Sequence, residues 1–88
     1  MKLKYNFVTN EVADKIVAVA VGEDMDKFNG FIKMNNIGAY IFNMLKEDVT
    51  VDDIVEAMKK DFTDATEQEI RETVEGFVAE LKKSEVID

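Results

Sequence analysis

The pattern of apolar and polar positions changes its period once along the chain. Before residue 35, three short segments carry the β-branched and aromatic residues typical of strands: 5–8, 16–21 and 31–34. The first of these should end at Thr9-Asn10, and a polar connection over 23–30 separates the second from the third. Short sequential strands with short connections favour an antiparallel meander, so this part of the chain predicts a three-stranded antiparallel sheet.

The central predicted strand, 16–21, is almost continuously apolar. A strand with one face in water alternates between apolar and polar residues, because successive side chains point to opposite faces of the sheet. The run therefore has two interpretations. Either both of its faces are covered by the rest of the domain, or one face is left for a partner.

From residue 36 onward the apolar positions recur every three or four residues, which is the spacing of helices. Asn35 or Asn36 can cap the first helix, because a short side-chain carbonyl can accept a hydrogen bond from an early helical amide. The polar run 46–48 ends that helix. A helix of about ten residues is therefore expected directly after the third strand.

Two capping boxes predict the starts of a second and a third helix. Thr50 with Asp53, and Thr66 with Glu69, have the three-residue spacing at which the side chain and backbone amide of each residue pair reciprocally. The faces predicted to turn inward on the three helices are Ile37, Tyr40, Ile41, Met44 and Leu45, then Ile54, Val55, Met58 and Phe62, then Ile70, Val74, Phe77, Val78 and Leu81.

These elements predict an α+β fold: a three-stranded antiparallel sheet followed by three helices, winged-helix-like in outline, in one domain that spans residues 1–88. Gly76 falls inside the third helix, where glycine costs up to about 1 kcal/mol relative to alanine. It either permits the close approach of another backbone or is simply tolerated.

Charge narrows the class of partner. The chain carries 19 acidic and 11 basic residues, a net charge of −8, with glutamates concentrated on the third helix. Phosphate backbones require a basic surface, so DNA binding, which the winged-helix outline would otherwise suggest, is not expected. The sequence shows no signal-peptide core and no apolar run long enough to span a membrane. No nucleic-acid or membrane partner is therefore expected, and a cytoplasmic location is.

Most catalytic and metal-binding chemistry lacks its usual residues. The chain has no histidine and no cysteine, and its four glycines form no phosphate-binding loop. The acidic segment 24–30 does not match a calcium loop, since Phe28 and Asn29 occupy the places of a ligand and of the turn glycine. Adjacent Asp52 and Asp53 are typical of a helix start. We therefore expect no catalytic, metal-binding or cofactor-binding residues, and no enzyme activity in this chain alone.

A pattern across the third strand and first helix resembles a known family. Met34-Asn35, Gly38-Ala39, Ile41-Phe42 and Leu45 occur in the order and spacing of the PqqD-like proteins, the family of pyrroloquinoline quinone biosynthesis protein D. Phe42 stands where that family has tryptophan, and Glu85 stands where a glycine is common. The similarity continues through Thr50, Ile54-Val55, Phe62, Val74, Phe77-Val78, Leu81 and Val86-Ile87, so it covers essentially the whole chain.

The resemblance implies a function as well as a fold. It implies a free-standing peptide chaperone that binds the leader of a ribosomally synthesised precursor peptide as an added strand and presents it to a modifying enzyme, often a radical S-adenosylmethionine enzyme. On this interpretation the peptide lies between the third strand and the third helix. The implied peptide-binding residues are Phe31, Ile32, Lys33 and Met34 on the strand, and Arg71, Val74, Val78 and Lys82 on the helix.

Most of these residues also have a purely structural interpretation. Phe31 and Met34 can lie at least partly in the core. Val74 and Val78 have the spacing of core residues, and Arg71 and Lys82 have the character of solvated charges. Lys33 can serve only to discourage aggregation at an outer strand. The alternative function is that of a non-catalytic structural or assembly protein, a homodimer in the simplest case, which self-associates through the same sheet edge.

Overall fold

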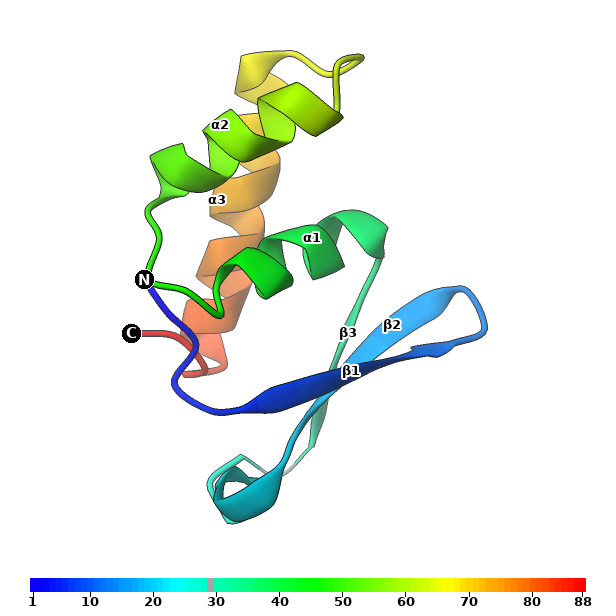
Figure 1. Ribbon diagram of the computed structural model, residues 1–88, viewed down its shortest axis with the longest axis vertical. Coiled ribbons are helices and arrows are strands. Elements are labelled where there is room, and N and C mark those ends of the chain that lie inside the picture. The colour runs from blue at the N-terminus through cyan, green and yellow to red at the C-terminus, as the bar shows by residue number, and fades with distance from the viewer. Residues whose placement is uncertain (29) are drawn as a thin grey trace.

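A three-stranded antiparallel sheet lies below three helices in the computed structural model of the chain, which describes residues 1–28 and 30–88 (Figure 1). The strands are β1 (Phe7–Val12), β2 (Lys15–Ala20) and β3 (Phe31–Met34), in the order β1-β2-β3. The helices are α1 (Asn36–Met44), α2 (Val51–Asp61) and α3 (Glu67–Lys83). The predicted α+β fold is confirmed.

The first strand is longer than its sequence predicts. It continues through Thr9 and Asn10 to Val12, because residues 7–12 pair with 15–20 in unbroken register. The chain then reverses in a two-residue turn at Ala13-Asp14, where Ala13 adopts a left-handed conformation with φ of 57°. The predicted end at Thr9-Asn10 was wrong because pairing with β2 outweighs the low strand propensity of Asn10.

The predicted helix starts are confirmed by their caps. The Asn35 side chain accepts a hydrogen bond from the Gly38 amide at 2.8 Å. Both predicted capping boxes are formed with reciprocal hydrogen bonds, and they start α2 after Thr50 and α3 after Thr66. These local signals set the residue at which each of the three helices begins.

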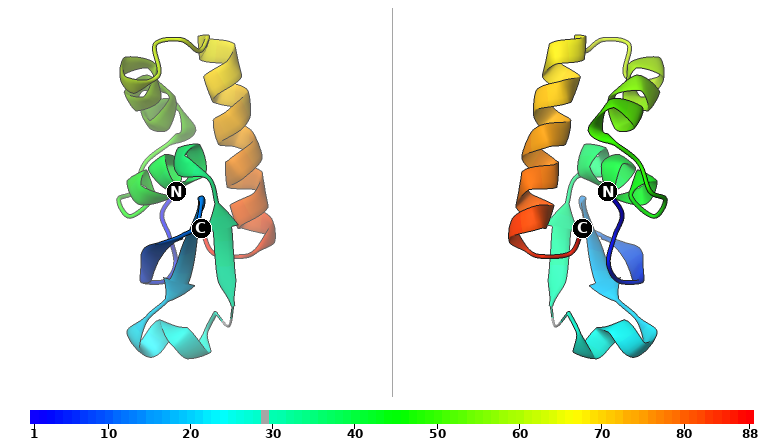
Figure 2. Two further views of the ribbon diagram at one scale, coloured as in Figure 1. Left: turned by 90° about the vertical axis from the view of Figure 1, so that its right-hand side faces the viewer. Right: turned by 90° about the vertical axis from the view of Figure 1, so that its left-hand side faces the viewer.

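The core lies between the inner face of the sheet and the helices. Ala18 on β2 and Phe42 on α1 are fully buried, and Phe7 packs against the Phe42 ring with 5.3 Å between ring centroids. The two ends of the chain meet beside this core, where the Lys4 amide donates to the Val86 carbonyl at 2.8 Å. Figure 2 shows that the second half of α3 runs beside β3, which brings this helix to one edge of the sheet.

The polar connection between β2 and β3 contains a short 3₁₀-helix, η1 (Gly22–Asp26). Asp24 in this segment accepts a hydrogen bond from the Asn6 amide at 2.7 Å, so this acidic side chain fastens the connection to the start of β1. Asn29, which the sequence argument against a calcium loop used, lies outside the described residues. Among the described residues, no helix is long and apolar enough to cross a membrane.

Candidate functional site: an open sheet edge beside helix α3

One edge of β3 is open. Within residues 1–28 and 30–88, β3 pairs only with β2, and no other strand lies along its far side. An unpaired strand edge presents backbone N–H and C=O groups that can hydrogen-bond to an added strand. Which of the residues in β3 offer these groups follows from the register of the sheet.

The hydrogen-bonding direction alternates along each strand of an antiparallel pair. The Val21 amide donates to the Asn6 carbonyl at 2.9 Å, so in β2 the odd-numbered residues bond toward β1. The even-numbered residues of β2 therefore bond toward β3, where Ala18 lies opposite Ile32 and Ile16 lies opposite Met34. Ile32 and Met34 use their backbone groups within the sheet.

The backbone groups of Phe31 and Lys33 consequently point toward the open edge. Their side chains lie on the outer face of the sheet, where Phe31 is 58% exposed and the Lys33 ammonium group lies 5.8 Å from the centre of the Phe31 ring. Ile32 and Met34 point to the inner face, and Met34 is buried. A strand added at this edge would thus pair with Phe31 and Lys33.

A groove lies next to the end of β3. Its floor is formed by the cap and first residues of α1, and its wall is formed by α3. Its volume is about 390 Å³, and the residues that line it are Asn35, Ile37, Gly38, Ile41, Thr73, Gly76, Phe77 and Glu80. We call this feature the α3 groove. An added strand at β3 would place alternate side chains on the inner face of the sheet, toward this groove.

Two glycines shape the α3 groove in opposite ways. A Cβ atom on Gly38 would lie 3.0 Å from Cε1 of Phe77 and 3.1 Å from Cβ of Met34, so the absence of a side chain lets Phe77 pack against the start of α1. A Cβ atom on Gly76 would meet no described atom within 4 Å. The close approach of another backbone that the sequence allowed for at Gly76 is therefore absent among the described atoms, and the close neighbours of Gly38 are side chains.

The four strand residues expected from the sequence lie together at the open edge, but the four helix residues do not share one surface. Val74 and Val78 are buried in the core and support the groove wall from behind. Arg71 pairs with Asp52 on α2 at 2.9 Å, and this hydrogen bond raises the pKa of its guanidinium group. Lys82 is exposed, about three turns from Arg71 on the same side of α3.

The sequence interpretation missed the residues of α3 that do line the groove: Thr73, Gly76, Phe77 and Glu80. They form a strip at three- and four-residue spacing, as does the strip that was expected. Spacing identifies residues that share a side of a helix, but not the neighbour that this side faces. Gly76 was the one available signal, because an exposed helical glycine with no packing role leaves space for another molecule.

The site holds little charge. Glu80 is the one charged residue among those that line the α3 groove within the described chain. The Lys33 side chain is exposed on the other face of the sheet. Backbone pairing and apolar contact are therefore the interactions that this site offers most readily.

Comparisons with known proteins agree with this geometry. A search of curated proteins finds no significant match. Among solved structures, the complex of TbiB1 with the TbiA(beta) leader peptide matches with a TM-score of 0.74 and 17% sequence identity, over 100% of this chain and 95% of that one. At this identity the match shows a common fold.

The family assignment rests on a separate comparison. The model of the family described as coenzyme PQQ synthesis protein D (PqqD) matches residues 16–87. This range contains β2 except for its first residue, together with β3 and all three helices, and therefore the open edge and the α3 groove. The chain belongs to the PqqD family.

Proposed function

We propose that this chain is a non-catalytic peptide chaperone that binds the leader of a ribosomally synthesised precursor peptide by strand addition at β3. The observation that carries the proposal is the open edge at Phe31 and Lys33 directly beside the α3 groove. Main-chain hydrogen bonds would supply affinity, and alternate side chains in the groove would supply selectivity. The fold shared with TbiB1, a protein solved in complex with a leader peptide, supports this assignment.

The other edge of the sheet is a poorer candidate. The backbone groups of Thr9 and Glu11 on β1 also point away from β2, by the same alternation. None of the residues that line the α3 groove comes from β1. A peptide on β1 would have main-chain bonds without a helix wall to contact its side chains.

The outer face of the sheet offers a second surface that a bound peptide leaves free. Val8, Val19 and Phe31 lie side by side across the three strands. At the outward positions of the described strands, the charged residues are Lys15 and Lys33, and no carboxylate occurs there although the chain carries a net charge of −8. We propose that this face contacts the modifying enzyme. The matching surface of the enzyme would have an apolar centre and an acidic border.

The resemblance of the sequence to PqqD-like proteins favours a radical S-adenosylmethionine enzyme as this partner. The role of the chain would then be to bring a bound precursor to that enzyme. Since the peptide edge and the outer face are different surfaces, the chain could bind the peptide and the enzyme at the same time.

The test is calorimetric titration with candidate leader peptides encoded beside the gene. We expect one-to-one binding at micromolar affinity or tighter for the cognate leader. Lys33→Pro should abolish it, because proline removes an amide that points toward the open edge. Glu11→Pro makes the same change at the opposite edge and should leave binding intact. Equal loss in the two variants, or none in either, would contradict strand addition at β3.

Sedimentation velocity on the same samples tests the alternative of self-association through this edge. A monomer that becomes a one-to-one complex with peptide agrees with the proposed function. A tight dimer that no peptide dissociates would favour the assembly role, because the two would compete for Phe31 and Lys33.

A further inference from the structure

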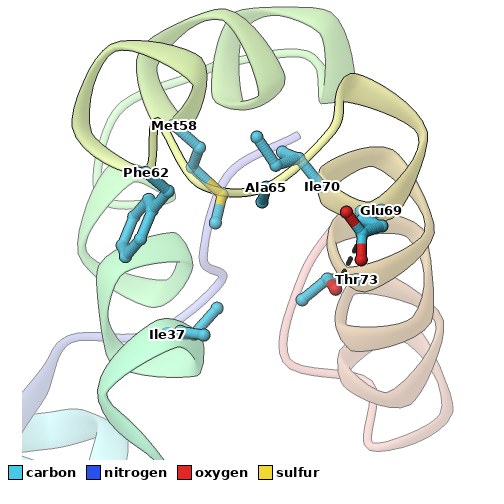
Figure 3. Close-up of a pocket in the computed structure, with 7 residues that line it drawn as sticks. All are labelled: Ile37, Met58, Phe62, Ala65, Glu69, Ile70 and Thr73. Carbon is cyan, nitrogen blue, oxygen red and sulfur yellow. Dashed lines mark hydrogen bonds between the residues drawn. The ribbon is translucent and has the colours of Figure 1, made fainter.

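A second cavity adjoins the α3 groove (Figure 3). Its apolar lining comes from four separate segments: Ile37 on α1, Met58 and Phe62 at the end of α2, Ala65 in the loop, and Ile70 on α3. Thr73 and Glu69 complete it. We call it the corner pocket. Figure 3 shows these side chains arranged around a common space at the corner where the chain turns from α2 to α3.

The corner pocket and the α3 groove are neighbours, since Ile37 and Thr73 line both. Ile37 was expected to face the core, but it is 38% exposed and stands at the junction of the two cavities. An exposed isoleucine at a junction between apolar cavities favours contact with an apolar ligand over contact with water. A peptide that follows the groove past the end of β3 would therefore arrive at this pocket.

Contacts join the elements that line the corner pocket. Lys59 on α2 pairs with Glu67 on α3 at 2.6 Å, and Arg71 on α3 pairs with Asp52 on α2 at 2.9 Å. Phe62, which forms part of the lining, packs edge-on against the Tyr40 ring with 5.3 Å between centroids. A pocket whose lining side chains are already packed in the free protein loses less entropy when it binds a ligand.

The chemistry of the lining defines the ligand. The volume is about 210 Å³, below the roughly 300–1,000 Å³ typical of small-molecule sites, and suits one side chain. The Thr73 hydroxyl already donates to the Glu69 carbonyl at 2.9 Å, which leaves its methyl group available for contact. Glu69 is the one charged lining residue in the described chain, and hydrogen bonds from Thr66 lower the pKa of its carboxyl group. An acidic side chain would be repelled here.

We infer that the corner pocket binds one aliphatic or aromatic side chain of the precursor peptide. The neighbouring residue in the peptide sequence would be basic and would lie beside Glu69. This inference rests on the proposed function. Because both strand pairs of the sheet are antiparallel, an added strand that follows the same pattern would place this residue N-terminal to the segment that pairs with β3. These two peptide residues, one apolar and one basic, would thus contribute to selectivity from outside the segment that pairs with β3.

The test is NMR titration of the full chain labelled at isoleucine and methionine methyl groups and at backbone amides. The probes are N-acetyl-Leu-Lys-amide, N-acetyl-Leu-Glu-amide and N-acetyl-Ser-Lys-amide. We expect saturable shifts of the Ile37 and Met58 methyl signals with Leu-Lys, with a dissociation constant on the order of millimolar for so small a ligand. Leu-Glu should bind several-fold more weakly, and Ser-Lys should give no saturable shift.

Variants keep the result specific to the pocket. Thr73→Leu adds bulk at an exposed position on the pocket wall and should abolish the Leu-Lys shifts. Gln68→Leu makes a comparable change at an exposed position of α3 that does not line the pocket, and it should leave them intact. No saturable shift with Leu-Lys, or equal loss in both variants, would overturn the inference. Equal affinity for Leu-Lys and Leu-Glu would overturn the basic preference.

The same spectra separate this inference from the proposed function. A cognate leader could shift the amide signals of Phe31 and Lys33 but leave the Ile37 and Met58 methyl signals unchanged. This result would contradict the pocket inference and leave strand addition intact. Shifts at the pocket methyl groups with no effect of any leader on the β3 amides would contradict strand addition.

Discussion

Gly38 and Phe77 are packed so closely that a Cβ atom on Gly38 would lie 3.0 Å from Cε1 of the Phe77 ring. This contact joins the start of α1 to the middle of α3 and so fixes the distance between the floor and the wall of the α3 groove. It also gives a physical reason for the glycine of the Gly38-Ala39 pair by which the sequence resembles its family.

Gly38→Ala should therefore destabilise the protein. The new methyl group also approaches Cβ of Met34 to 3.1 Å, and that atom belongs to a strand and cannot move aside easily. We expect the free energy of unfolding to fall by about 1–3 kcal/mol, the usual cost of overpacking a core. Urea denaturation measures this directly. Unchanged stability would show that Phe77 is free to move and that the groove is not held by this contact.

Gly76→Ala should have the opposite effect on stability and a harmful effect on binding. The added methyl group meets no described atom within 4 Å, and alanine in a helix interior is favoured over glycine by about 0.5–1 kcal/mol. The same methyl group projects into the α3 groove. We expect a more stable protein whose affinity for the leader peptide is several-fold lower. A variant that gains stability and binds equally well would place the peptide elsewhere.

Arg71→Ala should leave peptide binding within about twofold of the original affinity. Its guanidinium group is held by Asp52 on α2 and does not line the α3 groove. The pair is solvent-exposed, so its loss should change the stability of the protein little. Calorimetric titration and urea denaturation of one variant measure both quantities. A large loss of affinity with little loss of stability would restore Arg71 to the peptide-binding surface.

Two glutamates at the start of α3 should make stability sensitive to acid. Backbone and side-chain hydrogen bonds from Thr66 lower the pKa of Glu69, and a hydrogen bond from Lys59 lowers that of Glu67, from ordinary values of 4.5. A carboxyl group whose pKa is lower in the folded state stabilises the fold above its unfolded pKa. That contribution is lost as the pH falls through the folded pKa.

The urea midpoint should therefore decline as the pH drops below about 4.5. Glu69→Gln should make this decline shallower, because glutamine keeps a carbonyl oxygen for the Thr66 amide but does not titrate. The test is a series of urea midpoints measured between about pH 3 and pH 7. Carboxyl groups in folded proteins titrate mostly in the lower part of this range. Identical acid dependence in the two proteins would show that Glu69 does not contribute.

The fold was predictable largely because short-range sequence signals set where each helix begins. Asn35, Thr50 and Thr66 cap helices through contacts with residues three positions away, so a short stretch of sequence contains the whole interaction. The end of β1 depends instead on pairing with β2, a neighbour that the residues 9–12 do not reveal by themselves.

The candidate site was predictable only in part, for a similar reason. Phe31 and Lys33 could be assigned to an edge strand from the sequence, but the direction of their backbone groups depends on the register of β1 with β2 and of β2 with β3. The side of α3 that faces β3 depends on the rotation of that helix within the core. The burial of Val74 and the contact of Phe77 with Gly38 set this rotation, and both are tertiary contacts.

The most direct test of strand addition is hydrogen exchange at the four amides of β3, with and without the cognate leader peptide. In the free protein the Ile32 and Met34 amides should be protected by β2, while those of Phe31 and Lys33 exchange quickly. Saturating peptide should protect Phe31 and Lys33 strongly and change Ile32 and Met34 much less. Tight peptide binding that leaves the Phe31 and Lys33 amides in fast exchange would contradict the account.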